Sequence, residues 1–454
     1  MIRRALLAAA LPALVASPIL AQDAPVPPDR DPRVAALVEA VSAERIEADV
    51  RTLAGFGTRH TLSDTLSDTR GIGAARRWIH AEFERISAAC GGCLEVSYQH
   101  AMVAGESRIP DSTWVVSVVA VLRGRTDPDR YVIMTGDIDS RISDAMDATS
   151  DSPGANDNAS GMAGVLEAAR VITSGPRDYA ASIAFGGLSG EEQGLYGGRH
   201  MAEVAGAEGW RLEAVLNNDM IGNIQGENGI VDNTTARVFS ESPAANTTPE
   251  ELRRMRFFGG EVDSPSRQVA RYVDRIADEY LRNLDVRMIY RLDRFGRGGH
   301  HRPFNDAGFP AVRIMETNED YRRQHQDLRV EDGVEYGDVV EEVEFDYAAK
   351  LTGLNVATLA ALARAPAPPG DVTIAGAVEP SARLAWSAVD DPNLAGYKVY
   401  WRDTTSPTWD HWRWVGRATE ATMDGLVVDN WLFGVAAAGT NGTESPVVFP
   451  SPAR

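Results

Sequence analysis

The sequence predicts an α/β domain with a mainly parallel central sheet flanked by helices, followed by a C-terminal β-sandwich. Before residue 365, short apolar runs alternate with helical periods of about 10 to 20 residues, which is the pattern of parallel strands joined by helical crossovers. After residue 370, short alternating strands are separated by turn residues. That second pattern is typical of a sandwich of about 85 residues.

The elements of the first region follow one another regularly. The stretch 223–300 between them is polar and only partly periodic, so we expect a long excursion over the sheet edge that shapes a substrate pocket. We predict helices around 33–53, 70–88, 160–173, 265–283 and 342–363, and strands near 131–135, 182–188, 214–220 and 311–316.

Two segments lie outside the predicted folded domains, one at the N-terminus and one between the two domains. Residues 1–21 resemble a secretory signal, with Arg3 and Arg4 before an apolar stretch too short and too interrupted by proline to span a bilayer. The Pro-rich stretch 365–370 has the composition of a linker. The expected organisation is a signal peptide (1–21), a catalytic-type domain (22–364), a linker (365–370) and a sandwich (371–454).

Composition and charge exclude several classes of function. An apolar share of 44% is that of a globular protein. The formal charge of −20 becomes −22 if the signal leaves, because two arginines and no acid go with it. Nucleic acid is therefore not an expected partner, and no second stretch is long and apolar enough to cross a membrane.

The only two cysteines, Cys90 and Cys93, form the sequence CGGC. A redox pair, half of a zinc site and a local disulfide are all open from spacing alone. In an exported protein with no second cysteine pair, a structural disulfide is the favoured interpretation.

Acidic residues follow four predicted strands or turns. They are Asp137 and Asp139, Asp157, Glu191 with Glu192, and Asp219. Any one of them alone would be read as a solvated loop charge. Neighbouring parallel strands end at one edge of a sheet, however, and several carboxylates gathered there repel unless cations lie among them. The sequence therefore predicts a metal site at this edge.

The types of residue suggest a division of roles. Of the adjacent Glu191 and Glu192, one can ligate a metal while the other transfers protons, because neighbouring side chains after a strand point in different directions. Asp157 precedes small residues that allow a tight turn into a helix. Its two oxygens could bridge two ions about 3.5 to 4 Å apart.

The motifs SPGANDNASGMAGVLEAAR, GLSGEEQGLYGG, LNNDMIG, AGFPAV and HQD resemble those of the M28 family of co-catalytic zinc peptidases, over about residues 40–363. The resemblance implies a secreted aminopeptidase with two divalent ions, zinc in the family. Asp157 would bridge the ions, Glu192 and His325 would complete one site, and Asp219 would bind the other ion. Glu191 would be the general base and Asp139 would orient the adjacent ligand.

Asp137 departs from the family pattern, which has a histidine there. With Asp137, Asp157 and Asp219 the second ion would have three carboxylate ligands, a set that suits Zn²⁺ less selectively and Ca²⁺, Mn²⁺ or Mg²⁺ relatively better. We keep Asp137 as a ligand because aspartate also binds zinc. His300 and His301, after a Gly-rich stretch, are assigned to the substrate pocket.

The C-terminal region resembles a fibronectin type III domain in the stretches GYKVYWRD and NWLFGVAAAGTNGTESP. Its tryptophans could form a face that binds carbohydrate or protein, although core packing explains them better. These residues are Trp386, Trp401, Trp409, Trp412 and Trp414.

We therefore expect an exported periplasmic or extracellular metallopeptidase that acts on peptides or proteins. A single-zinc glutaminyl cyclase is an alternative with a related fold. A third hypothesis is a binding protein that has lost catalysis, since Asp137 replaces the usual histidine.

Overall fold

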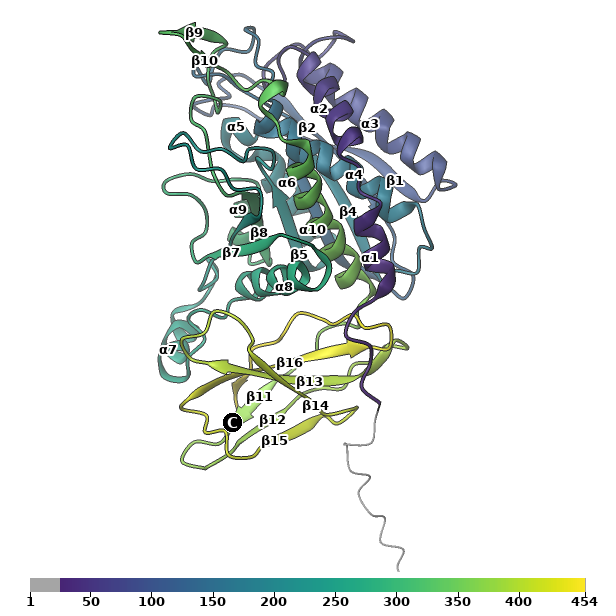
Figure 1. Cartoon of the computed structure of the whole chain (residues 1–454), viewed down its shortest axis with the longest axis vertical. Helices are drawn as coiled ribbons and strands as arrows, with labels where there is room; N and C mark the ends of the chain where they lie inside the picture. Colours follow the sequence, from purple (N-terminus) through teal and green to yellow (C-terminus); the bar gives the residue numbers. More distant parts are fainter. Residues whose placement is uncertain (1–24, 454) are drawn as a thin grey trace, which may run out of the picture.

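The computed structural model describes residues 25–453 (Figure 1). The predicted signal segment 1–21 lies outside these residues. Within them, no helix combines the length and apolar character needed to cross a bilayer.

An eight-stranded sheet forms the centre of the larger part of the molecule, in the order β1-β2-β4-β3-β5-β8-β6-β7. The four strands β4, β3, β5 and β8 are parallel, while β1, β2 and β6 pair antiparallel at the two sides. The expected α/β fold is confirmed, with more antiparallel pairing than expected. The strands are β1 (Leu94–Val103), β2 (Thr113–Leu122), β3 (Asp127–Asp137), β4 (Ala181–Leu188), β5 (Arg211–Asn218), β6 (Thr235–Phe239), β7 (Asp285–Ile289) and β8 (Ala311–Glu316).

Helices cover both faces of this sheet, which explains why the central strands are apolar along their whole length. In β3, Val132 and Met134 pack in the cluster that includes α4 and α10, whereas Tyr131 and Ile133 pack in the cluster of α6 and α9. The helices are α1 (Pro32–Glu39), α2 (Ala43–Gly55), α3 (Gly71–Ala89), α4 (Gly161–Thr173), α5 (Glu191–Gly194), α6 (Tyr196–Ala207), α7 (Pro249–Phe258), α8 (Pro265–Tyr280), α9 (His301–Asp306) and α10 (Phe345–Arg364).

Two sequence expectations need correction. The helix expected over 33–53 is two helices, because Ser42 accepts a hydrogen bond from the backbone of Arg45 and starts α2 separately. The stretch 223–300 is more than an excursion, since β6 and β7 within it extend the sheet beyond β8. Strands β1 and β2 were not foreseen from the sequence at all.

Cys90 and Cys93 form a disulfide in the turn between α3 and β1, as expected. The pairing joins the end of a helix that packs on the sheet to the start of an edge strand.

The C-terminal strands form two small sheets, one of four strands and one of three, below α8 in Figure 1. Trp386 lies in the core between them, and Trp409 donates to Gln268 of α8. Of the five tryptophans, only Trp412 is more than one-third exposed, so core and interface packing account for most of the set. The strands are β11 (Thr373–Ala375), β12 (Ala382–Ala385), β13 (Leu394–Asp403), β14 (His411–Trp414), β15 (Glu420–Met423), β16 (Trp431–Gly439) and β17 (Ser451–Pro452).

Buried ion pairs join this C-terminal part to α8. Asp263, just before α8, accepts hydrogen bonds from Arg271 of α8 at 2.8 Å and from Arg402 of β13 at 2.9 Å, and all three side chains are buried. Glu444 similarly meets Arg275 of α8 and Lys398 of β13. The two parts are therefore fixed to each other by matched charges.

Candidate metal centre and active site

The carboxyl ends of three neighbouring strands carry the predicted acidic residues. Asp137 is the last residue of β3, Asp219 directly follows β5, and Glu191 and Glu192 begin α5 just after β4. Asp157 lies in an irregular turn, 155–160, that leads into α4. Strand order brings the ends of β4, β3 and β5 side by side, as the sequence argument required.

Asp157, Glu192 and His325 form a compact cluster. His325 Nε2 lies 2.9 Å from Asp157 Oδ2 and 3.1 Å from Glu192 Oε1, and one ligand atom from each residue lies within 4.8 Å of the others. Two carboxylates and one imidazole match a zinc site with a position left for water or substrate. These three residues therefore fit one divalent ion.

The electrostatics of the cluster also favour a cation. Burial lowers the pKa of His325, but Glu192 and Asp157 outweigh burial and raise it to about 9. Without a metal ion the cluster thus attracts a proton, and a divalent ion would satisfy the same carboxylates. Arg141 contacts Glu192 Oε2 at 2.8 Å and His325 Nδ1 at 2.6 Å. A metal ion held by Nε2 would leave the ring proton on Nδ1, and Arg141 could then no longer donate to that nitrogen.

Glu191 differs from its neighbour Glu192. Its half-buried carboxylate has no hydrogen-bond or ion-pair partner within residues 25–453, although its backbone N–H donates to Asp139. Burial, followed by the nearby charges of Glu192 and Asp219, raises its pKa well above the ordinary value. A free carboxylate with raised pKa beside a metal cluster is suited to accept a proton.

Asp139 holds the turn that presents the two glutamates. Its oxygens accept from the backbone N–H groups of Glu191 at 3.2 Å and Glu192 at 3.1 Å, and from the hydroxyl of Thr61 at 2.9 Å. Asp139 therefore positions residues of the centre through their backbone. Within residues 25–453, Asp139 has no hydrogen bond to an imidazole.

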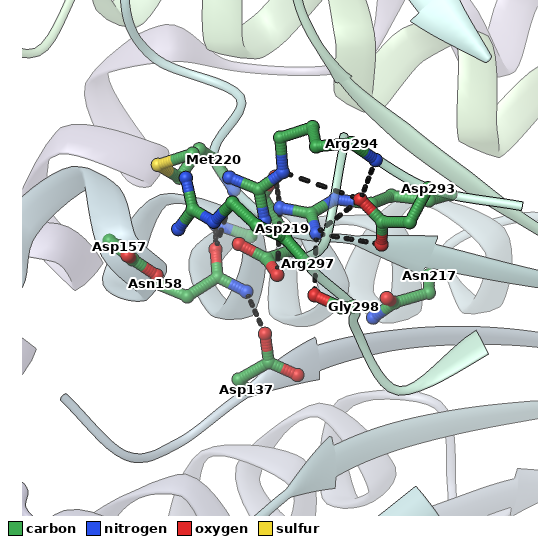
Figure 2. Close-up of polar contacts among 12 residues, drawn as sticks. Asp137, Asp157, Asn158, Asn217, Asp219, Met220, Asp293, Arg294, Arg297 and Gly298 are labelled. Atoms are coloured by element: carbon green, nitrogen blue, oxygen red, sulfur yellow. Dashed lines mark hydrogen bonds and ion pairs between the residues drawn. The ribbon is translucent and has the colours of Figure 1, made fainter. Parts of the chain in front are cut away.

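The second predicted metal position is built differently. Asp137 Oδ2 accepts from Asn158 at 2.7 Å, and Asp137 Oδ1 lies 2.6 Å from His300 Nδ1. Asp219 Oδ2 is paired at 2.9 Å with Arg313, whose side chain is fully buried on β8. Figure 2 shows Asp219 beside the arginines and Asn158 between Asp219 and Asp137. Protein groups thus already satisfy three of these four carboxylate oxygens.

No second metal-ligand cluster forms in the described part of the chain around Asp137 and Asp219. The remaining oxygen, Asp219 Oδ1, is buried and has no hydrogen-bond partner. The residues present fit one ion at Asp157, Glu192 and His325. They do not assemble a second site of the same kind, and two ions remain an expectation of the resemblance.

His300 and His301 do not line the substrate pocket, contrary to expectation. Both side chains are fully buried; His300 faces Asp137, and His301 Nε2 lies 2.8 Å from the carbonyl oxygen of Leu292. The Gly-rich approach suggested a mobile rim, but it instead directs these rings into the protein.

A cavity of about 660 Å³ opens above the cluster. Asp157, Glu191, Glu192, Asp219 and His325 lie in its wall, so the candidate catalytic groups face one common space. The wall also contains six arginines, which the sequence analysis did not single out: Arg108, Arg141, Arg199, Arg294, Arg297 and Arg302.

Two other supporting residues were missed. Asp338 accepts the backbone N–H groups of Asn156 at 2.8 Å and Asp157 at 2.7 Å, and so fixes the turn of the metal cluster. Arg313 sits in the apolar strand AVRIME. A charged side chain in a strand buried on both faces requires a partner of opposite charge, so the sequence could have predicted an acidic partner for Arg313. Asp338, in a loop 181 residues from Asp157, gave no signal.

Comparison with known proteins gives consistent results. The family model "Peptidase family M28" matches residues 117–330. A probable zinc metalloprotease of Pyrenophora teres f. teres is 42% identical, over 94% of this chain and 89% of its own length. A probable zinc metalloprotease of Leptosphaeria maculans is also 42% identical, over 94% of this chain and 99% of its own length.

Solved structures are similar in fold. The LapA aminopeptidase of Legionella pneumophila has a TM-score of 0.52 at 19% identity, covering 73% of this chain and 72% of its own. LapB of the same organism has a TM-score of 0.51 at 17% identity, covering 72% and 74%. These structures bear on the sheet and its helices, and they say nothing further about the site.

Proposed function

From the premise that this chain belongs to peptidase family M28 and is a zinc metallopeptidase, we propose that it is an aminopeptidase. The observation that carries the hydrolytic chemistry is the unpartnered carboxylate of Glu191 beside the cluster of Asp157, Glu192 and His325, in the wall of one cavity.

Asp157, Glu192 and His325 would hold a zinc ion. A zinc ion bound there supplies polarisation of the scissile carbonyl and acidification of water. Glu191 takes a proton from the attacking water and returns it to the leaving amine, because its carboxylate has no partner within residues 25–453 and lies in the cavity wall beside the cluster. Asp139 holds the backbone of Glu191 and Glu192 in place during these transfers.

Recognition of a free amino terminus is assigned to Asp219. Arg313 occupies Oδ2 of this residue, whereas Oδ1 is an unsatisfied buried acceptor in a residue of the cavity wall. An α-ammonium group would provide the missing donors. This is the feature that favours an aminopeptidase over an endopeptidase.

We further propose that one zinc ion suffices. Arg313 neutralises the charge of Asp219, and Asn158 and His300 satisfy both oxygens of Asp137, so only Asp219 Oδ1 lacks a hydrogen-bond partner at the second position. Metal analysis of purified protein, dialysed against metal-free buffer, should give one zinc per chain. Two tightly held ions would support the two-ion arrangement that the sequence resemblance implies.

Export to the periplasm or the extracellular space is also proposed. It rests on the signal-like residues 1–21 and agrees with the disulfide between Cys90 and Cys93, since disulfides persist in oxidising compartments. N-terminal sequencing of protein recovered from the producing cells should begin at Gln22. Protein that retains Met1 in the cytosol would contradict export.

The test of the catalytic proposal is Glu191→Gln. We expect hydrolysis of an aminoacyl-p-nitroanilide to fall by about 10³-fold or more, because no equivalent base is left, while zinc content is unchanged. Glu203→Gln, an exposed change on α6, is the matched control and should leave the rate within about twofold. Unchanged turnover in Glu191→Gln would remove this residue from the mechanism.

A glutaminyl cyclase is the second candidate, favoured by the single three-residue cluster. Its reaction releases ammonia from a peptide with N-terminal glutamine, without cleaving a peptide bond. Ammonia release in the absence of peptide hydrolysis would replace the aminopeptidase proposal with this one.

A further inference from the structure

The cavity wall contains six arginines and five carboxylates, and we call these arginines the arginine rim: Arg108, Arg141, Arg199, Arg294, Arg297 and Arg302. The whole chain carries a formal charge of −20, so this concentration of cations runs against its composition. Two of the carboxylates, Asp157 and Glu192, belong to the cluster that fits a divalent ion. The six arginines already outnumber the five carboxylates of the wall, and a divalent ion would add to the positive charge.

The six arginines fall into two groups. Arg141 pairs with Glu192, and Arg294 and Arg297 both reach Glu319. The other three have no carboxylate within 4.0 Å in residues 25–453; they are Arg108, Arg199 and Arg302.

The contacts of these three arginines show which are available. Arg108 donates to the backbone carbonyl of Glu192 at 2.6 Å. Arg199 lies over the ring of Tyr196 at 5.3 Å. Arg302 has no side-chain hydrogen bond in the described chain, and its Nε is buried without a partner. Arg199 and Arg302 line the cavity and have no hydrogen-bond acceptor within residues 25–453, so a ligand with carboxylate oxygens could supply one.

Arg199 and Arg302 are carried by two packed helices. Arg199 is on α6 and Arg302 on α9, and both helices contribute to one core cluster through Met201 and Phe304. The backbones approach closely, since a β-carbon at Gly198 would lie 2.9 Å from the carbonyl oxygen of His300. The two cations therefore stand on a rigid support, which suits recognition of a defined group.

We propose that Arg199 and Arg302 bind a carboxylate of the substrate, so that the enzyme selects anionic peptides. The inference rests on the proposed aminopeptidase and names its substrate class. The carboxylate has two chemical sources: an acidic side chain at the N-terminal residue, or the terminal carboxylate of a dipeptide. Guanidinium groups match either one in geometry and charge.

Two pairs of nearly isosteric substrates separate these sources. Glutamyl-p-nitroanilide against glutaminyl-p-nitroanilide tests the side chain, and leucyl-glycine against leucyl-glycinamide tests the terminus. We expect at least about a tenfold higher kcat/KM for the carboxylate member of one pair, falling as salt is raised.

The variant test is Arg199→Gln with Arg302→Gln. It should reduce that preference to about twofold or less, mainly through KM, while the neutral substrates react at nearly the original rate. Arg253→Gln, an exposed change on α7, removes the same charge away from the cavity and should keep the preference. Equal kcat/KM for both members of each pair in the unchanged enzyme would overturn the inference, as would a preference that survives the double change.

Failure of the proposed function gives a different result. If none of the four substrates is hydrolysed, calorimetric binding of leucyl-glycine and leucyl-glycinamide, and of glutamate and glutamine, to the zinc-loaded protein decides the inference. Tighter binding of a carboxylate member, lost in the double variant, upholds the anion site without aminopeptidase activity. Equal binding or no binding removes it.

Discussion

Two groups of buried charges in this molecule differ in how they are balanced, one at the acidic edge of the main sheet and one at the contact between α8 and the C-terminal strands. At the contact, Asp263 meets two arginines, and Arg275 and Lys398 overcome burial to hold the pKa of Glu444 below its usual range. At the acidic edge, burial and neighbouring acids raise the pKa of Glu191 well above its usual range.

The difference separates structural charges from functional ones. Matched pairs at the contact fix one part of the chain on the other and leave no demand for a ligand. At the sheet edge there are more carboxylates than positively charged side chains paired with them, so a cation or a proton must balance the remaining negative charge. Arg313 pairs with Asp219 at the acidic edge, so one matched ion pair of the structural kind lies inside the functional region.

The largest expected effect comes from removing a residue of the metal cluster. His325→Ala should lose zinc on dialysis and lower kcat/KM by about 10³-fold or more, because two carboxylates alone bind the ion weakly. Atomic emission and peptide hydrolysis measure the two results. His200→Ala on α6 is the control, and full zinc retention in His325→Ala would contradict the assignment.

At the structural contact, Asp263→Ala should lower the free energy of unfolding by about 3 to 5 kcal/mol, since it leaves Arg271 and Arg402 buried without their acid. Zinc content should not change. Denaturant unfolding measures the loss, and Asp424→Ala on the surface should cost less than about 0.5 kcal/mol. A loss of zinc in Asp263→Ala would show that the two regions are coupled.

The buried carboxyl group of Asp137 should make the stability of the folded protein depend on pH. Burial raises its pKa to about 8, so the folded state prefers the protonated form and its contribution to stability is lost as pH rises from about 4 to 8. In chelator, the wild-type protein should become less stable between pH 5 and 8.

Asp137→Asn should reduce that loss by about 1 to 3 kcal/mol, because it removes the ionising group and keeps an acceptor for Asn158. Urea unfolding at the two pH values measures it. One zinc per chain should remain. If the variant loses zinc, Asp137 is a ligand after all, as its place in the sequence suggested.

The smallest expected effect concerns the disulfide. Changing both Cys90 and Cys93 to Ser should cost about 1 to 2 kcal/mol of stability, because the closed loop is short. Peptide hydrolysis should stay the same, since the turn contributes no residue to the cavity wall. A large fall in activity would assign the turn a role beyond stability.

Much of the fold could be predicted because periodicity is a local property. Helices α3, α4 and α8 and strand β8 lie within a few residues of their expected positions. Strands β6 and β7 were missed in a polar stretch because each is only five residues long and lacks the continuous apolar run of the central strands. The division of 33–53 into two helices depended on a cap at Ser42 that the apolar pattern does not report.

By itself, the sequence determined which acids reach the edge of the sheet, because parallel strands end together and the residues after them share that edge. Only the tertiary structure decided which of those acids meet a cation. Arg313 reaches Asp219 across 94 positions, and His325 reaches Asp157 across 168. Such pairings depend on strand order and loop paths, and electrostatic energy depends on distances that no local pattern contains.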